Sequence, residues 1–342
     1  MSSNIQHLSP SSDTGRLGIM HLKRYWEKGQ MRKSGKLAND AFFEEWNTDN
    51  ALLAALGLGI EQTIVQLYNG ADSFASFEKW VETTVKGEYD IVKINAFNRF
   101  ITSQTLPADT ANIELTLSEN DLDFWDRNGY VIIRDAVSKE DCKATVKLIC
   151  DYIEIDQDDP SGWYNPHPGK QGIMVQLFQS PLLEKNRHSP KIKKAYEQLW
   201  GRKDIWVNTD RVGFNPPETS FWKFPGPRMH WDVSLQLPIP FGLQGILYLT
   251  DTASDQGAFT LVPGFHTKVE EWLNNLPPDT NPRDEKVIAD LGPCSIAAHA
   301  GDFIIWHHAL PHGSCANTSM VPRFVQYINY APLDMEVREK WI

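Results

Sequence analysis

The chain is poor in cysteine. Only four occur in 342 residues, and these are Cys142, Cys150, Cys294 and Cys315. None of them belongs to a C-x-x-C pair, and the wide spacing argues against both a zinc ribbon and a disulfide framework. We therefore expect reduced thiols whose role is packing.

Long apolar runs are also missing. The longest, Ala51 to Ile60, is much shorter than the ~18 residues that a membrane span needs. The segment from Met1 to Gln6 lacks the charged-then-apolar pattern of a secretory signal. The sequence therefore predicts a cytoplasmic protein that has no membrane as partner.

Positive charge is scarce as well. Lysine and arginine number 33 against 44 acidic residues, which gives a net charge of −11. A polyanion is repelled by such a field unless basic residues cluster locally, and no such cluster is visible, so nucleic acid is not an expected partner. The 22 glycines and 21 prolines are an ordinary share, which excludes a collagenous or low-complexity chain.

The first third of the sequence has a helical pattern. Residues 1–16 are rich in Ser, Pro, Asp and Gly without periodicity, which is typical of a flexible tail. In residues 17–116, apolar side chains recur at steps of three and four, for example at Leu52, Leu56 and Ile60. We therefore expect a helical N-terminal extension over 17–116.

The pattern changes near Leu117. Ser118 opens an S-x-x-D capping signature, Gly129 ends that helix, and the apolar run from Tyr130 to Arg134 predicts a strand. Ser138 starts a second helix to about Ile153. Further on, short strand-like segments alternate with turns, at 205–214, 229–237, 243–249, 258–262, 295–299, 303–307 and 324–331. This punctuation predicts a sandwich or barrel over 117–342, a class that includes the jelly rolls.

The first candidate for chemistry is His230-Trp231-Asp232 in one of these segments. In a strand, side chains alternate, so His230 and Asp232 would project from one face about 7 Å apart and could share an ion. Such a pair is also expected by chance in a chain with ten histidines. A surface salt bridge is the plain alternative.

The second candidate is His312-Gly313-Ser314, followed by a turn and by Arg323 at the start of an apolar strand. If Asn317 and Thr318 occupy the centre of a hairpin turn, His312 lies opposite Arg323, and Ser314 shares their face. An imidazole, a hydroxyl and a guanidinium would then line one wall of a pocket. The alternative is an ordinary hairpin whose arginine pairs with a surface carboxylate.

The two candidates explain each other when they are joined. Two histidines and one carboxylate form the facial triad of non-haem Fe(II) oxygenases, which leaves three octahedral positions open. A bidentate 2-oxo acid fills two of these positions, and dioxygen takes the last. Arg323 could then hold the distal carboxylate of the 2-oxo acid, and Ser314 could donate a further hydrogen bond to it.

These motifs resemble, in order, those of the phytanoyl-CoA dioxygenase-like Fe(II)/2-oxoglutarate oxygenases. The run from Leu117 to Asp135 resembles the helix and N-G-Y-V strand at the start of that family. Met229–Asp232 is similar to its H-x-D motif, and Gln256–His266 to the stretch that ends in P-G-S-H. Ala300–Phe303 is similar to its A-G-D turn, and His312–Arg323 resembles its H-G-S-x-x-N-x-S-x-x-x-R.

The resemblance implies a mainly β domain with flanking helices around a double-stranded β-helix, the jelly-roll or cupin-like core. It also implies Fe(II) held by His230, Asp232 and His312, and 2-oxoglutarate held by Arg323 and Ser314. Arg211 and Asn215 share one face of the preceding strand and are weaker candidates for contacting 2-oxoglutarate or a polar substrate. The helical extension has no counterpart in the family pattern.

The function implied is a dioxygenase that hydroxylates an unactivated C–H bond of a small metabolite, amino-acid-like or acyl, and releases succinate and CO2. Desaturation, epoxidation or cyclisation at the same centre remains open, and a non-catalytic binding jelly roll is a further alternative. Asp232 disfavours the related halogenases, which carry Ala or Gly at this position. A carrier protein or a homodimer could use the N-terminal helices, and the sequence does not rank these.

Overall fold

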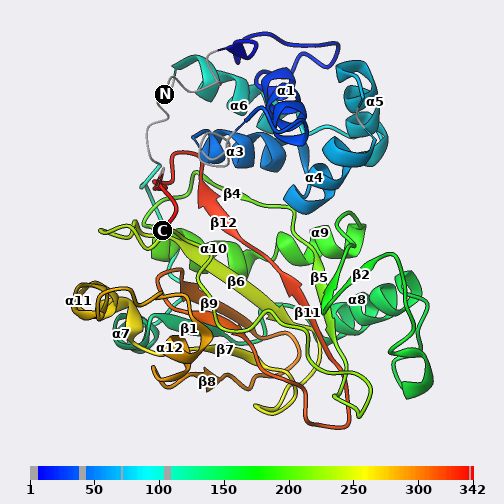
Figure 1. The fold of residues 1–342 in the computed structure, drawn as a ribbon. Helices are drawn as coiled ribbons and strands as arrows, with labels where there is room; N and C mark the ends of the chain where they lie inside the picture. Colours follow the sequence, from blue (N-terminus) through cyan, green and yellow to red (C-terminus); the bar gives the residue numbers. More distant parts are fainter. Residues whose placement is uncertain (1–6, 38–43, 71, 104–108, 339) are drawn as a thin grey trace. The chain divides into compact units, whose positions relative to one another are not determined.

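The computed structural model describes residues 7–37, 44–70, 72–103, 109–338 and 340–342 (Figure 1). The chain divides into two compact units. The first, here the helical unit, comprises Met1–Asp109, Asp204–Thr209 and Ala331–Ile342. The second, here the sheet unit, comprises Thr110–Lys203 and Asp210–Tyr330. The assignment of residues 1–16, 17–116 and 117–342 to separate domains stays a prediction.

The helical unit is built from amphipathic helices whose apolar faces share one core. Among its buried residues are Leu52, Phe77 and Phe97. Leu333, from the C-terminal segment, belongs to the same cluster, and Trp206 packs against it. Its helices are α1 (Leu22–Lys33), α3 (Trp46–Leu56), α4 (Ile60–Asn69), α5 (Phe74–Thr84) and α6 (Ile91–Ser103), and β4 (Ile205–Val207) pairs with β12 (Tyr330–Pro332).

Residues 7–16 differ from the flexible tail that their composition indicates. Leu8 is buried, and the Ser9 hydroxyl and amide both donate to the Glu27 carboxylate at 2.7 Å. The Ser11 hydroxyl lies 2.8 Å from Nδ1 of His21. These contacts fix the segment to α1 and explain why a polar composition is compatible with order. Residues 1–6 of the predicted tail lie outside the described residues.

A buried charge network lies inside the helical unit. Lys28 is fully buried and forms ion pairs with Asp49 and Glu45, the second at 3.5 Å. His21 lies 3.1 Å from the other oxygen of Asp49, and Arg24 donates to Glu45 at 2.8 Å. The lysine and arginine supply the positive charge that these two carboxylates need when they are removed from water.

No single helix of the described residues is long and apolar enough to cross a membrane. Helices α3 and α4 together have the length and apolar composition of a membrane span, but the chain bends by 98° between them.

The sheet unit begins as the sequence predicts. The Ser118 hydroxyl accepts from the Asp121 amide, and Gly129 ends α7 (Glu119–Asn128) with a φ of 72°, in the left-handed region where glycine carries no steric cost. Strand β1 (Tyr130–Ile133) follows directly, and then Ser138 caps α8 (Lys139–Tyr152). The other helical segments are η2 (Pro160–Gly162), α9 (Pro181–Arg187), α10 (Pro190–Trp200), η3 (Phe265–Thr267), α11 (Val269–Asn275) and α12 (Glu285–Ala289).

Two antiparallel sheets form the centre of this unit (Figure 1). The larger has seven strands in the order β1-β9-β6-β11-β5-β3-β2, and the smaller has three in the order β10-β7-β8. Both contribute to one hydrophobic cluster, for example through Ile304 and Val325 of the larger sheet and Leu261 of the smaller. The strands are β2 (Lys170–Gln171), β3 (Met174–Val175), β5 (Val212–Asn215), β6 (Leu243–Tyr248), β7 (Phe259–Leu261), β8 (Cys294–Ser295), β9 (Phe303–His307), β10 (His312–Ser314) and β11 (Arg323–Tyr327).

The fold is therefore the predicted mainly β jelly-roll core with flanking helices and helices that precede it. Four predicted strands are wrong in detail. The segment 205–214 is divided into β4 and β5, and 324–331 is divided into β11 and β12, and in each case the two strands lie in different sheets. The segment 295–299 is a strand only where β8 ends, and Ala298 forms an isolated bridge with Thr252.

The segment 229–237 forms only an isolated bridge between His230 and His312. The reason lies in the backbone partners, because the Arg283 side chain donates to the carbonyls of Trp231 and Val233, which a strand neighbour would otherwise engage.

Candidate functional site

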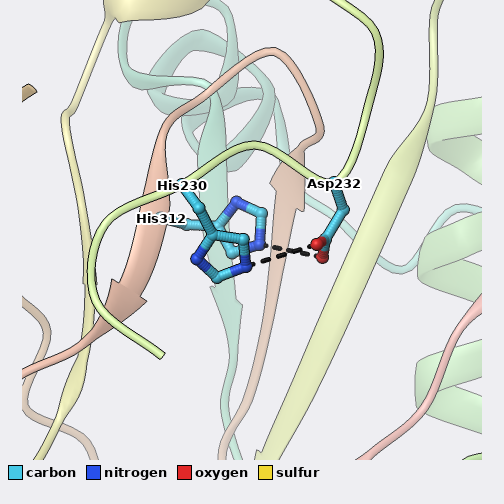
Figure 2. A group of neighbouring side chains, drawn as sticks. All are labelled: His230, Asp232 and His312. Carbon is cyan, nitrogen blue, oxygen red and sulfur yellow. Dashed lines mark hydrogen bonds and ion pairs between the residues drawn. The ribbon is translucent and has the colours of Figure 1, made fainter. Parts of the chain in front are cut away.

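Three side chains far apart in the sequence converge at the smaller sheet (Figure 2). His312 lies on β10, His230 is bridged to it, and Asp232 follows on the irregular segment. The Nε2 atoms of His230 and His312 lie 3.2 and 3.3 Å from the two oxygens of Asp232. The potential ligand atoms of all three residues lie within 4.8 Å of one another.

The hydrogen bonds of the two imidazoles fix which nitrogen faces the carboxylate. Nδ1 of His230 lies 2.6 Å from the Arg228 carbonyl, and Nδ1 of His312 lies 3.1 Å from the Leu310 carbonyl. A carbonyl only accepts, so each Nδ1 carries a proton, and in the neutral ring Nε2 presents a lone pair toward Asp232. Two lone pairs and a carboxylate that face one another require positive charge between them. Their donor set, two imidazoles and one carboxylate, fits a divalent iron.

The pKa directions are consistent with this need for positive charge. Burial opposes the ionisation of Asp232, but the imidazoles of His230 and His312, which donate to the carboxylate when they are protonated, outweigh it and hold the Asp232 pKa well below its usual value. Burial also opposes the charge of His230, yet its contact with Asp232 gives it a raised pKa. Although 52% of the Asp232 side chain is accessible, that surface faces a cavity.

The predicted hairpin that joins His312 to Arg323 is wrong, but the contact that it implied is present. Strand β10 pairs with β7, where His312 is opposite Leu261, whereas β11 pairs with β5, where Arg323 is opposite Asn215. The chain passes from one sheet to the other between them. Even so, Nη1 of Arg323 donates to the Ser314 hydroxyl at 3.2 Å.

Arg323 is fully buried and has hydrogen-bonding capacity left over. In the described part of the chain no carboxylate lies within ion-pair distance of it, and its Nε and Nη2 atoms have no hydrogen-bond partner. Oδ1 of the buried Asn215, its neighbour in register, is also without a partner. A buried guanidinium with two unused donors fits the carboxylate of an organic acid such as 2-oxoglutarate.

A cavity of about 120 Å³ is lined in part by the triad residues and by Ser314. Arg323 is not among the lining residues, and its hydrogen bond to Ser314 connects it to this wall. Of the two residues predicted to contact cosubstrate or substrate, Arg211 lines this cavity and Asn215 does not, and their roles stay predictions. Sequence reasoning missed the other polar residues of the wall, because no motif marks them: Asp210, Gln244, Tyr327 and Asn329.

Other histidines near the motif lie outside the cluster. Nε2 of His308 faces the Pro240 carbonyl, and Nδ1 of His307 accepts from the Ala309 amide. The ring of His266 packs against that of His307 at 5.5 Å. Among the described residues, a second group with metal-ligand geometry consists of His21, Glu45 and Asp49, where Lys28 already supplies the positive charge.

Comparison with known proteins adds independent information. The sequence profile of the phytanoyl-CoA dioxygenase (PhyH) family matches residues 125–325, more than half of the chain. A Dictyostelium discoideum protein assigned by name to the phytanoyl-CoA dioxygenases is 28% identical over 264 residues, which cover 62% of this chain and 75% of that protein. The ectoine dioxygenase of Bordetella bronchiseptica is 21% identical over 243 residues, covering 64% of this chain and 76% of that enzyme.

Among solved structures, EctD from S. alaskensis with bound Fe is 19% identical, with a TM-score of 0.49, covering 68% of this chain and 83% of that one. The family match spans the stretch that contains His230, Asp232 and His312, and both cofactors of the family suit the donor groups described above. The chain belongs to the phytanoyl-CoA dioxygenase family and is an Fe(II)- and 2-oxoglutarate-dependent dioxygenase.

Proposed function

We propose that His230, Asp232 and His312 hold the iron, that Arg323 and Ser314 hold 2-oxoglutarate, and that the enzyme hydroxylates an unactivated C–H bond of a small metabolite. When bound, iron and 2-oxoglutarate would supply the chemistry that reduces dioxygen: one oxygen atom enters the substrate, the other enters succinate, and CO2 is released. The protein supplies position and charge. The observation that carries the proposal is the buried Arg323, which keeps unused donors and is hydrogen-bonded to Ser314, a residue that lines the same cavity as the triad.

The polar wall of the cavity supports an amino-acid-like substrate over a purely acyl one. Asp210 and Arg211 contribute a carboxylate and a guanidinium to the lining, and Asn329 contributes an amide. Asp210 pairs with Arg211 at 3.9 Å and accepts from the Asn329 amide at 3.4 Å. A substrate that carries its own charged groups can extend this network, whereas an apolar chain cannot. Arg211 is then a substrate contact, and Asn215 is a 2-oxoglutarate contact beside Arg323. A carrier protein or homodimer that uses the N-terminal helices stays a prediction.

The test is anaerobic addition of Fe(II) and 2-oxoglutarate to the full chain, followed by the visible metal-to-ligand charge-transfer band. We expect the band in the wild type and its loss in His312→Ala. Arg323→Ala should need about 10- to 100-fold more 2-oxoglutarate, since it removes charge-assisted hydrogen bonds. His299→Ala and Arg127→Ala remove a surface histidine and a surface arginine and should match the wild type.

Absence of the band in metal-replete wild type would contradict the proposal. If the band appears, candidate metabolites can be screened for those that stimulate succinate release. Mass analysis of the product then distinguishes a gain of one oxygen from a loss of two hydrogens. A product that has lost two hydrogens would show that the reaction is desaturation or ring closure and not hydroxylation.

A further inference from the structure

The carboxylate of Asp232 has one more partner that no sequence motif indicates. Nε2 of Gln244 donates to Oδ2 of Asp232 at 2.8 Å. Gln244 lies on β6, which runs between β9 and β11 in the larger sheet, and its register partner is Trp306. Asp232 itself lies on an irregular segment. The hydrogen bond therefore ties a loop carboxylate to a strand that is held on both sides.

The orientation of the Gln244 amide follows from the chemistry of its partner. Oδ2 of Asp232 lies 2.8 Å from the Gln244 amide nitrogen, and a carboxylate oxygen accepts hydrogen bonds. The amide nitrogen must then face Asp232, and the amide oxygen must turn away. Oε1 of Gln244 is buried and has no partner among the described residues. The hydrogen bond that the amide nitrogen donates to Asp232 is therefore what favours this orientation of the Gln244 side chain.

The backbone around Asp232 is restrained separately. Arg283 donates from Nη1 to the Trp231 carbonyl at 2.9 Å and from Nη2 to the Val233 carbonyl at 2.7 Å. This clamp fixes the Cα of Asp232 but leaves its side chain free to rotate. Gln244 acts on that remaining freedom, because it contacts the carboxylate itself.

We propose that Gln244 is a positioning residue for the metal carboxylate: its amide holds the Asp232 side chain in the orientation in which it faces both histidines. The inference rests on the proposed function. A carboxylate that gives an oxygen to a metal is usually hydrogen-bonded through its remaining capacity, and loss of such a partner typically weakens metal binding by about 10- to 100-fold. Gln244 never needs to touch the metal to have this effect.

A merely structural glutamine would behave differently. With one end of the amide unpartnered, an apolar side chain of similar length should be tolerated at this position. Gln244→Met removes the donor and keeps the length, while Gln244→Asn keeps the amide but shortens its reach by one carbon. Gln198→Met is the matched control, because Gln198 accepts from the Thr116 and Leu117 amides and donates to the Leu117 carbonyl away from the cavity.

The experiment titrates Fe(II) into each full-length variant under anaerobic conditions with saturating 2-oxoglutarate, and measures thermal unfolding in parallel. We expect Gln244→Met and Gln244→Asn to need about 10- to 100-fold more Fe(II) to develop the charge-transfer band, with little change in Tm. Gln198→Met should lower Tm and leave the Fe(II) titration unchanged.

The inference is overturned if either folded Gln244 variant titrates as the wild type does. Failure of the proposed function has a different signature, since the wild type itself would then show no band. If Gln244→Met does not fold, Gln244→Asn decides the question, because it preserves polarity and adds no bulk.

Discussion

The guanidinium of Arg323 donates to the hydroxyl of Ser314 across a change of sheet. Arg323 begins β11 of the larger sheet, Ser314 ends β10 of the smaller, and the two groups lie 3.2 Å apart. The bond therefore connects the two halves of the jelly roll at the cavity. Any group that binds Arg323 is also placed beside Ser314.

Ser314→Ala should raise the 2-oxoglutarate requirement without affecting iron. The hydroxyl orients Arg323 and can itself contact the cosubstrate, and one hydrogen bond to a charged group is worth about 1.5–3 kcal/mol, or roughly 10- to 150-fold. Titration of 2-oxoglutarate against the charge-transfer band at saturating Fe(II) measures this change. An unchanged midpoint, or a loss of Fe(II) binding, would argue against the role given to Ser314.

Gly257→Ala should disturb the surroundings of Arg323 by displacing Asn215. Gly257 has a φ of 64°, and a Cβ there would lie 2.2 Å from Nδ2 of Asn215, the register partner of Arg323. We expect lower stability and weaker 2-oxoglutarate binding, because Asn215 must move. The strain of positive φ alone costs about 1–2 kcal/mol.

Gly292→Ala is the control for that strain. Gly292 also has a positive φ of 78°, but a Cβ there meets nothing within 4 Å. It should therefore lose stability in urea unfolding and keep the wild-type 2-oxoglutarate titration. Equal effects of both variants on the titration would show that Asn215 is not involved.

Acid should destabilise the sheet unit through its buried histidines. Burial lowers the pKa of His307 to about 3 and that of His308 to about 4. At a pH below the unfolded-state histidine pKa of about 6.5, the unfolded chain binds protons at these two residues and the native state does not. The free energy of unfolding therefore decreases as the pH is lowered from about 6.5 to those two values. Each histidine costs up to about 1.4 kcal/mol per pH unit in this window.

Urea unfolding at pH 7.5 and 5.5 measures the loss. His307→Asn keeps an acceptor for the Ala309 amide but cannot be protonated, and it should reduce the difference between the two pH values by roughly half. His188→Asn changes a histidine whose side chain is 53% exposed and should leave the difference unchanged. A wild type equally stable at both pH values would contradict the prediction.

Asp49→Asn should unfold the helical unit more easily. It removes the carboxylate that Lys28 and His21 share in a fully buried site, and breaking a buried ion pair by removing one partner costs about 3–5 kcal/mol. Thermal unfolding followed by circular dichroism gives the change. Asp72→Asn is the comparison, since Asp72 is 94% exposed and pairs with Lys33 at 3.8 Å, and its effect should be close to zero.

Local signals in the sequence predicted the local structure well. Ser118, Gly129 and Ser138 are confirmed as helix boundaries, because caps depend on a few adjacent residues. The spacing of His230, Asp232 and His312 led to three side chains that the structure indeed brings together, although their role as iron ligands stays a proposal.

Long-range competition for backbone partners was not predictable. A run such as 229–237 looks like a strand, and only the fold shows that Arg283 occupies the carbonyls on both sides of Asp232. His312 and Arg323 were predicted as neighbours in one hairpin, yet each has its strand partner elsewhere, at Leu261 and at Asn215. Gln244 carries no local signal at all, since its contact with Asp232 depends on the position of β6.

The core of the helical unit contains residues from three separate stretches of chain, among them Trp206 and Leu333. During synthesis, the five helices between Leu22 and Ser103 leave the ribosome first, but Leu333 is added some 230 residues after the last of them. The unit that is made first is therefore completed last. The early helices therefore lack their contacts with Trp206 and Leu333 until the oxygenase sheet has been translated.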